Sequence, residues 1–398
     1  MAERRVGLWL VGAFGGVGTT TAVGLSAMAR GGTPPIGMVT ALPQFKKADW
    51  DEFGTFVVGG HDIRNGSFGG TANELHLRAG VFTAELLKQC EPDLTAWTAN
   101  VRPGVIYRPN EVIAKLADRR DVKAASDPVA AILQIQQDLR AFESDHRLDQ
   151  LVVVNCASTE PPFPLTEDHQ TMAGLEQILD RPNPPPLPTS SLYAYAALDA
   201  LYPYVNLTPS LGASIPAIEE LALLRSTPHA GQDAKTGETL LKSVLAPMFA
   251  RRNLKVLSWV GHNILGNRDG LVLSDPQNKA SKVRSKDALL ADLLGYRPQS
   301  HVSIEYIESL DDWKTAWDHI HFEGFLGTKM TLQFTWQGCD SILAAPLVID
   351  LARLVLRAQR RGQAGAIKPL ACFFKSPIGV AEHDFGKQFE LLEQYLKG

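Results

Sequence analysis

The apolar pattern at the start of the chain predicts a strand, a tight turn and a helix. An apolar run over Val6–Val11 leads into the glycine-rich segment G-A-F-G-G-V-G at 12–18, which an Ala/Leu/Met segment follows. That segment ends at Arg30-Gly31-Gly32, and glycine is a frequent helix stop. Residues 6–30 are therefore expected to open a parallel α/β sheet.

The same alternation of strands and helices continues to about residue 210. The run 151–154 is apolar throughout, which is typical of a strand in a parallel sheet covered on both faces. The proline-rich piece 181–188 is expected to be an exposed connection. Further strands are expected at 36–41, 56–62 and 205–207, and helices at 71–94, 127–150 and 191–202.

After His229 the pattern predicts a different kind of sheet. A long helix is expected over 236–252. Because the elements that follow are mostly short strands, we expect an antiparallel sheet with helices on one face. Its strands are expected at 254–259, 270–273, 301–307 and 330–335, and a short helix is expected to begin at 311–314.

The last sixty residues return to alternation. A long amphipathic helix is expected over 341–361, and an apolar strand should end at Lys375. A final helix is expected over 383–396. We therefore expect this tail to pack back onto the first domain.

These elements predict a Rossmann-type doubly wound parallel sheet with an inserted α+β domain. A chain of 398 residues is long enough for two domains. The expected boundaries are 1–238 plus 343–398 for the nucleotide-binding domain and 239–342 for the inserted catalytic and oligomerisation domain.

Composition narrows the class of protein. With 45% hydrophobic and 21% charged residues and no repeated tract, the chain is typical of a soluble globular protein. A net charge of −4 argues against a broad nucleic-acid or anionic membrane surface. No segment is apolar for long enough to cross a bilayer. The four cysteines lack C-x-x-C spacing, so we expect reduced thiols and a cytoplasmic location.

The glycine-rich turn at 12–18 is a candidate dinucleotide site. Gly12, Gly15, Gly16 and Gly18 would let the backbone approach a pyrophosphate, and amides at the start of the following helix would face it. A plain turn is the alternative. No acid follows the expected second strand at 36–41, so Asp62 is the nearest candidate for holding a ribose, although an ordinary loop aspartate is equally open.

Polar residues follow the apolar strand 151–154. In doubly wound sheets, ligands bind at the carboxyl ends of the strands. Asn155, Ser158 and Thr159 are therefore candidate cofactor contacts.

A second candidate site begins at the helix expected from Thr236. Its first turn would expose backbone amides beside the hydroxyls of Thr236 and Thr239 and the ammonium of Lys235, which is a suitable seat for a phosphate. An ordinary helix start with Thr236 as N-cap is an equal alternative.

Three lysines share one side of a possible helix near residue 280. Lys279, Lys282 and Lys286 are spaced i, i+3 and i+7, and the leucines at 289–294 continue the same side. Lysines directed inward could bind an anion and transfer protons, because desolvation lowers the pKa of an ammonium group. The alternatives are that they extend past the leucines to solvent or that the helix is broken.

Several ordered motifs together resemble the myo-inositol-1-phosphate synthase (inositol-3-phosphate synthase) family in its compact prokaryotic-type form, over nearly the whole chain. They are G-x-x-G-G-x-G at 12–18, G-G-H-D-I-R at 59–64, D-A-K-T-G-E-T-L-L-K at 233–242, N-I-L-G-N-R-D-G at 263–270, S-K-V-R-S-K at 281–286, Lys314, D-S-I-L-A-A-P at 340–346 and F-F-K-S-P at 373–377.

The resemblance implies a reaction. Members convert D-glucose 6-phosphate to 1L-myo-inositol 1-phosphate with bound NAD that is reduced and then reoxidised. Carbon 5 is oxidised, carbon 6 is enolised and attacks the carbon 1 aldehyde, and hydride returns to carbon 5. Such a reaction needs several proton transfers and stabilisation of an oxyanion, and desolvated lysines can supply both.

The resemblance also implies roles for individual residues. The catalytic set is Lys282, Lys314 and Lys375 as proton carriers and oxyanion donors, with Asp233, Asp269 and Asp340 positioning them. Substrate would be bound by Thr236, Gly237, Thr239, Asn263 and Lys286. NAD would be bound by Gly12, Phe14, Gly15, Gly16, Val17, Gly18, Asp62, Ser158 and Thr159.

Assembly and ion requirement are also implied by the resemblance. It implies a homotetramer built largely through the inserted sheet, and either a monovalent cation (ammonium or potassium) or a divalent one (magnesium or zinc). The chain departs from the family at Gly261-His262, where Ser-Tyr is more usual, and at Arg268, where asparagine is usual. A net NAD(P)-dependent dehydrogenase and a non-enzymatic NAD-binding protein are the alternative functions.

Overall fold

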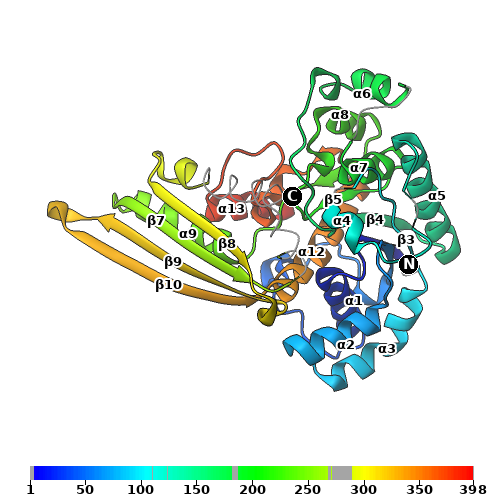
Figure 1. Ribbon diagram of the computed structural model, residues 1–398, viewed down its shortest axis with the longest axis horizontal. Helices are drawn as coiled ribbons and strands as arrows, with labels where there is room; N and C mark the ends of the chain where they lie inside the picture. The colour runs from blue at the N-terminus through cyan, green and yellow to red at the C-terminus, as the bar shows by residue number, and fades with distance from the viewer. Residues whose placement is uncertain are drawn as a thin grey trace.

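The computed structural model describes residues 4–109, 111–122, 124–181, 187–267, 270 and 289–397. They are arranged around two sheets, a large one within a helical body and a smaller one that extends from it (Figure 1). The large sheet has the strand order β11-β6-β5-β4-β1-β2-β3, and every pair in it is parallel. Its strands are β1 (Val6–Val11), β2 (Phe56–Asp62), β3 (Val101–Pro103), β4 (Gln150–Asn155), β5 (Tyr204–Asn206), β6 (Pro228–Ala230) and β11 (Gly365–Ala366).

Helices cover both faces of the parallel sheet, as the doubly wound prediction requires. On one face α1 packs against α2, α3 and α12, and α12 also contacts β4, β5 and β6. On the other face α5 and α8 pack against α7. The helices are α1 (Gly16–Ala29), α2 (Phe68–Ala79), α3 (Ala84–Thr98), α4 (Glu111–Leu116), α5 (Pro128–His146), α6 (Met172–Leu179), α7 (Thr189–Asp199), α8 (Pro216–Leu224), α12 (Asp340–Arg360) and α13 (Phe385–Lys397).

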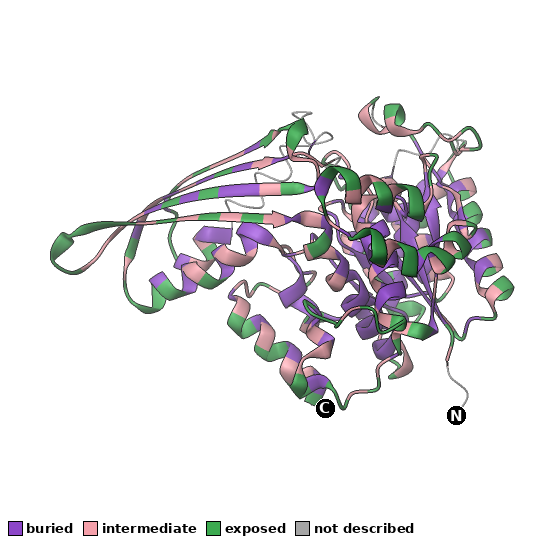
Figure 2. Cartoon of the chain, turned by 90° about the horizontal axis from the view of Figure 1, so that it is seen from below, coloured by how far each residue is buried: buried purple, intermediate pink, exposed green. Residues whose placement is uncertain are grey.

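Strand β1 shows why the parallel strands are apolar throughout. Successive side chains point to opposite faces of a strand. Leu8 and Leu10 lie in the hydrophobic core on the α12 face, whereas Trp9 and Val11 lie in the core on the α5 face. All of β1 is buried, and most of the parallel sheet has the colour of buried residues in Figure 2.

The second sheet has the strand order β10-β9-β7-β8. β7 is antiparallel to β9, as expected, but its pairing with β8 is parallel, so the fully antiparallel prediction was wrong for that pair. Helix α9 (Gly237–Arg251) and the helical residues 289–294 cover one face, where Phe249, Trp259 and Ile320 share a core. The strands are β7 (Lys255–Leu265), β8 (Gln299–Tyr306), β9 (Trp313–Glu323) and β10 (Lys329–Cys339).

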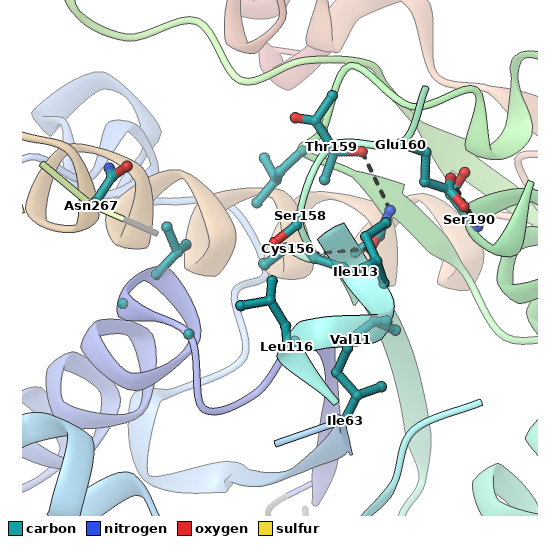
Figure 3. A pocket seen from close by; sticks show the side chains of 18 of the residues that line it. Val11, Ile63, Ile113, Leu116, Cys156, Ser158, Thr159, Glu160, Ser190 and Asn267 are labelled. Atoms are coloured by element: carbon teal, nitrogen blue, oxygen red, sulfur yellow. Dashed lines mark hydrogen bonds between the residues drawn. The ribbon is translucent and has the colours of Figure 1, made fainter. Parts of the chain in front are cut away.

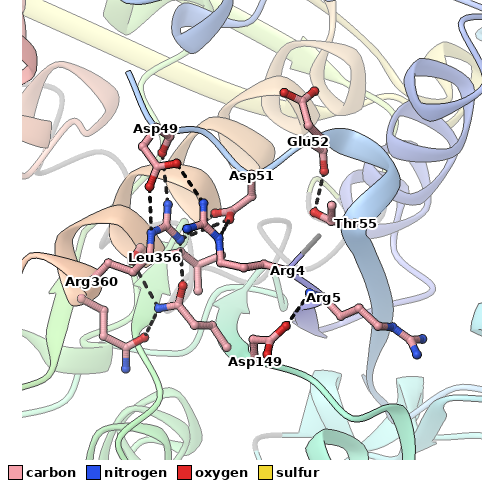
Figure 4. Close-up of polar contacts among 11 residues, drawn as sticks. Arg4, Arg5, Asp49, Asp51, Glu52, Thr55, Asp149, Leu356 and Arg360 are labelled. Atoms are coloured by element: carbon pink, nitrogen blue, oxygen red, sulfur yellow. Dashed lines mark hydrogen bonds and ion pairs between the residues drawn. The ribbon is translucent and has the colours of Figure 1, made fainter. Parts of the chain in front are cut away.

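The C-terminal tail returns to the first domain, as predicted. β11 adds to the edge of the parallel sheet beside β6. Arg360, at the end of α12, donates to Asp51 Oδ2 at 2.9 Å, and Arg4 donates to Asp51 Oδ1 at 3.1 Å (Figure 4). The two guanidinium groups therefore tie the residues just before β1 and the end of α12 to one carboxylate.

The expected strand at 36–41 is wrong. This segment contains the 3₁₀ turn Val39–Ala41 instead. Asp350 of α12 accepts hydrogen bonds from Val39 N at 2.6 Å, from Thr40 N at 3.0 Å and from the Thr40 hydroxyl, so these amides are satisfied without a neighbouring strand. The strand beside β1 is β2, and Asp62 stands at its end, where a ribose-binding acid is usual.

Other sequence expectations also fail locally. The helical pattern 71–94 is two helices, because Gly80 ends α2 in the left-handed conformation (φ 65°). Residues 311–314 do not begin a helix, since β9 starts at Trp313. Lys375 follows a 3₁₀ helix (Lys368–Phe373) rather than a strand, and proline at its start cannot donate to a sheet.

Some expectations fall outside the described residues. Gly270 is helical rather than extended, and 271–273 are not described. The lysines of the 279–286 segment, Asp269 and residues 182–186 are also outside the described residues. The leucines after that segment are described, and Leu289, Leu290 and Leu294 are buried, as the pattern predicted.

Candidate functional site

A cavity of about 710 Å³ lies at the carboxyl ends of the parallel strands and extends toward the second sheet. It opens where β1 and β4 lie side by side, the point at which the strand order reverses. Ligands of doubly wound sheets bind at this point. The predicted site residues on its wall are Gly12, Gly15, Gly16, Val17, Asp62, Asn155, Ser158, Thr159, Asp233, Thr236, Lys314, Asp340 and Lys375.

The glycine loop forms one wall of this cavity. Gly12 has φ 85°, a conformation that favours glycine, and a Cβ there would lie 3.1 Å from the backbone of Ala157. Gly15 is the N-cap of α1 and no side chain caps that helix, so its first amides remain available to an anion. The loop therefore fits a pyrophosphate.

Asp62 anchors the loop from the neighbouring strand. Its Oδ2 accepts a hydrogen bond from Phe14 N at 2.7 Å, and its Oδ1 accepts one from Arg64 N at 2.9 Å. Each carboxylate oxygen can accept more than one bond, so the group can still receive a ribose hydroxyl. Asp62 is thus both a structural clamp on the loop and a candidate ribose ligand.

The cavity has an apolar end and a polar middle. Figure 3 shows the apolar side chains of Val11, Ile63 and Leu116 in the lower part of the view, and all three line the cavity. Ser158 and Thr159 lie beside the end of β4, and Asn267 stands at the opposite side (Figure 3). This gradient suits a ligand with a base at one end and polar groups along its length.

The second sheet contributes the other wall. Lys314, near the start of β9, lines the cavity, and its ammonium makes no hydrogen bond or ion pair with another residue in the described ranges. The Asp340 carboxylate accepts a hydrogen bond from Asn267 Nδ2 at 3.3 Å. A half-buried lysine without a fixed partner is available to a substrate oxygen.

Asp312, which sequence reasoning missed, lines the cavity beside the glycine loop. Its Oδ2 accepts hydrogen bonds from Cys339 Sγ at 2.8 Å and from Ser341 N at 3.2 Å, at the first turn of α12. A Cβ at Gly16 would meet Asp312 Oδ1 at 3.4 Å, so this oxygen faces the loop. Burial raises the pKa of the Asp312 carboxyl.

Lys375 reaches the cavity from the opposite side. Its Nζ forms an ion pair with Asp233 Oδ1 at 2.8 Å. Asp233 is buried, has φ 63° and has no hydrogen-bond partner at Oδ2 among the described residues. Nearby Lys235 is buried and donates to Gln388 Oε1, and burial lowers its pKa to about 8.

Glu160 is a second residue that sequence reasoning missed. Its carboxylate accepts hydrogen bonds from Thr189 N at 2.6 Å and from Ser190 N at 3.2 Å, at the start of α7. It lines the cavity, and burial raises its pKa. An acid directly after Ser158-Thr159 was the available sequence clue.

Some predicted site residues do not line the cavity. The Phe14 ring packs edge-on against Phe68 in the core, and a Cβ at Gly18 would lie 2.5 Å from the Ala13 carbonyl, so both serve packing. Asn263 donates to Glu238 Oε2 at 2.7 Å beneath the first turn of α9. Gly237 and Thr239 lie in that same turn and are buried. Asp269, Lys282 and Lys286 lie outside the described residues.

The start of α9 has the geometry of an anion seat. Thr236 occupies the N-cap position, but its side chain makes no capping hydrogen bond. The hydroxyl and the first amides of the helix therefore remain available, which the ordinary capping alternative did not predict.

Comparison with known proteins decides the family. The sequence profile described as "Myo-inositol-1-phosphate synthase" matches residues 6–397. The chain belongs to the myo-inositol-1-phosphate synthase family. Among its relatives, inositol-3-phosphate synthase 1 of Bacteroides thetaiotaomicron is 33% identical, with 100% of this chain and 96% of that protein covered. Inositol-3-phosphate synthase 1 of Populus euphratica is 32% identical over 77% of this chain, which spans 61% of its length.

Solved structures of the synthase family share this fold. Inositol-3-phosphate synthase from Caenorhabditis elegans superposes with a TM-score of 0.87 at 25% identity, covering 99% of this chain and 85% of that one. A myo-inositol-1-phosphate synthase-related protein from Thermotoga maritima gives a TM-score of 0.78 at 24% identity, with 99% of each chain covered. The Rossmann-type prediction with an additional sheet is thereby confirmed.

Proposed function

We propose that this chain is an inositol-3-phosphate synthase, an isomerase that converts D-glucose 6-phosphate to 1L-myo-inositol 1-phosphate with NAD as a recycled cofactor. One observation carries the proposal: a single cavity joins the glycine loop after β1 to Lys314, Lys375 and Thr236. Family membership over residues 6–397 supports it.

The reaction requires a cofactor and several proton transfers. NAD, when bound, supplies the acceptor and then the donor of one hydride at carbon 5. Protons must leave the carbon 5 hydroxyl and carbon 6, and protons must return to the new oxyanion at carbon 1 and to the carbon 5 oxygen. No atom is gained or lost overall, so the product is an isomer of the substrate.

The lysines are proposed to carry these protons. Lys314, which has no fixed partner among the described residues, would donate to a substrate oxyanion and take the proton back. Asp233 holds the Lys375 ammonium at 2.8 Å and would orient it toward the reacting carbons. Lys282 and Lys286 are assigned from motif position alone to proton transfer and phosphate binding, and the family motifs assign Asp269 and Asp340 to positioning the lysines.

The phosphate is proposed to bind at the start of α9. Amides of Gly237 and Thr239, together with the Thr236 hydroxyl, would receive it at the positive end of the helix dipole. Asn263 is proposed to support this substrate site. Asp62, Ser158, Thr159 and the loop 12–18 are proposed to bind NAD.

The two-domain boundaries, 1–238 plus 343–398 and 239–342, stay a proposal, and the two separate sheets support it. We also propose a homotetramer built through the second sheet, whose outer face carries Trp317 at 45% exposure.

A cytoplasmic location is proposed as well, and the four free cysteines agree with it. Within the described ranges, none of the helices is long and apolar enough to cross a membrane.

The cation requirement is proposed without a choice between a monovalent ion (ammonium or potassium) and a divalent one (magnesium or zinc). Of the residues that the structure describes, no three or more His, Cys, Asp or Glu side chains form a group that could hold a metal. The catalytic assay can separate these ions directly.

The deciding experiment is incubation with glucose 6-phosphate and a catalytic amount of NAD, in parallel with ammonium, potassium, magnesium or zinc. We expect inositol phosphate, identified by chromatography against a standard, with no accumulation of NADH. Stoichiometric NADH without inositol phosphate would instead establish a net dehydrogenase. Binding of NAD with no turnover under any of the four ions would favour a non-enzymatic binding protein.

A further inference from the structure

Beneath the first turn of α9 lies a fully buried ion pair. Glu238 and Lys242 are one helical turn apart, and Lys242 Nζ lies 2.6 Å from Glu238 Oε1. Their side chains are 1% and 0% exposed. Buried charges are costly unless they are paired, so this arrangement needs an explanation.

The pair is fixed by the neighbouring strand. Asn263 Nδ2 donates to the second carboxylate oxygen, Glu238 Oε2, at 2.7 Å. The indole of Trp259 lies beside Lys242, with Nζ 5.8 Å from its ring centroid. The Glu238 side chain is therefore directed from α9 onto β7.

Gly261 makes room for this carboxylate. A Cβ at residue 261 would lie 2.5 Å from Glu238 Oε1 and 3.2 Å from Asp318 Oδ1. Contacts below 3.0 Å force a shift, so a serine at 261 is incompatible with the observed position of Glu238. The glycine at 261 thus leaves the space that the Glu238 carboxylate occupies.

The electrostatics of the helix start explain why the carboxylate must be held. Glu238 belongs to the first turn of α9, which the N-cap side chain does not cap and whose positive dipole end attracts any anion. A carboxylate there competes with a phosphate for the same amides. Lys242, four residues further along, holds the carboxylate toward the body of the helix and away from its start.

We propose that Lys242 is a positioning residue that keeps the Glu238 carboxylate from occupying the phosphate seat, and that Gly261 provides the space for that carboxylate. This inference rests on the proposed function, because it concerns the phosphate site of that reaction. Neither Lys242 nor Glu238 lines the cavity, so their effect on the substrate is indirect.

The test compares Lys242→Met with the double variant Glu238→Gln/Lys242→Met. The single variant releases a negative charge that can turn toward the amides, so KM for glucose 6-phosphate should rise about tenfold or more, with a smaller change in kcat. The double variant carries a neutral amide at 238, and its KM should return to near the wild-type value. Binding of inorganic phosphate, followed by calorimetry, should change in parallel.

A purely structural pair would behave differently. It would lower the melting temperature and kcat, and Glu238→Gln would not rescue KM; that result, or an unchanged KM in Lys242→Met, overturns the proposal. If Lys242→Met does not fold, Gly261→Ala displaces the carboxylate without removing any charge. It should weaken phosphate binding, and Glu238→Gln should restore it; unchanged phosphate binding in Gly261→Ala overturns the proposal.

A different result would contradict the proposed function, so the two proposals can be tested separately. Wild-type protein that forms no inositol phosphate contradicts the activity itself. Wild-type protein that forms it, with no KM response in these variants, contradicts only the role of Lys242.

Discussion

The two sheets of this molecule bury their side chains differently. Every residue of β1 is buried, whereas β10 alternates between exposed and half-buried positions along most of its length. The parallel sheet is covered on both faces, so the ends of its strands are the available place for a ligand. Among the described residues, helices cover only one face of the second sheet, which presents side chains to the cavity from the start of β9.

This difference separates two contributions to one site. The parallel sheet supplies backbone amides and a rigid loop, which suit a cofactor that stays bound. The second sheet supplies charged side chains such as Lys314, which suit proton transfer. Changes in the first sheet should therefore affect stability and cofactor binding, and changes in the second should affect turnover and assembly.

The largest expected effect is that of Lys314→Ala. Turnover should fall by about 10³-fold or more, because the variant removes a proton carrier, and NAD affinity should be unchanged. Steady-state assays and NAD titration by fluorescence measure the two quantities. Lys329→Ala, an exposed lysine at the start of β10, is the matched control. Loss of NAD binding in Lys314→Ala would place this lysine in the cofactor site instead.

The next largest effect is a difference in the free energy of unfolding between variants of the two sheets. Leu8→Ala removes a fully buried side chain from β1 and should lower the free energy of unfolding by about 2–5 kcal/mol. Gln333→Ala lies on the exposed side of β10 and should change it by less than about 0.5 kcal/mol. Urea denaturation of both variants measures the difference. Equal losses would mean that the outer face of the second sheet is buried in the assembled protein.

The connection between the sheets should respond to alkaline pH. Burial lowers the pKa of Lys235 to about 8 in the folded protein from its ordinary value of 10.5. Between these values the unfolded chain binds the additional proton, so stability should rise with pH from 8 to 10.5, by about 3 kcal/mol. Lys235→Met should remove this rise, which unfolding curves across that range detect. A rise of the same size in the variant would assign it to another group.

The smallest effect on the folded chain is expected for Trp317→Glu. Trp317 is 45% exposed on β9, so its replacement should leave the protomer folded with a change below about 1 kcal/mol. If the outer face is the assembly surface, a buried glutamate would reduce the oligomer to smaller species in analytical ultracentrifugation. Leu77→Glu replaces another exposed apolar residue, 72% exposed on α2, and should leave the assembly intact. An unchanged oligomer in Trp317→Glu would exclude this face.

Much of the parallel sheet could be predicted from local pattern. Consecutive residues are enough to predict the strand Val6–Val11 and the glycine turn after it, and the β4 strand is recognisable from its apolar run. The 36–41 segment could not be predicted in this way, because its amides are satisfied by Asp350, more than three hundred positions away. Trp313-Lys314 follows two acids that resemble a helix start, although the next residues alternate as in a strand.

The candidate site shows the same limit. Family motifs identified Asp62, Lys314 and Lys375, and all three line the same cavity in the structure. Asp312 and Glu160 were missed, because their importance comes from burial and from contacts with distant helix starts. The spacing of residues along the sequence does not predict which distant helix start a carboxylate will contact.

The bond between Asp350 and the Thr40 amide also has a consequence for biosynthesis. A growing chain emerges from the ribosome N-terminus first, so Thr40 is exposed to solvent long before Asp350 has been made. The nucleotide-binding half therefore cannot reach its final packing during most of translation. Truncated nascent chains that end before residue 350 should be more sensitive to protease at 36–41 than the completed protein.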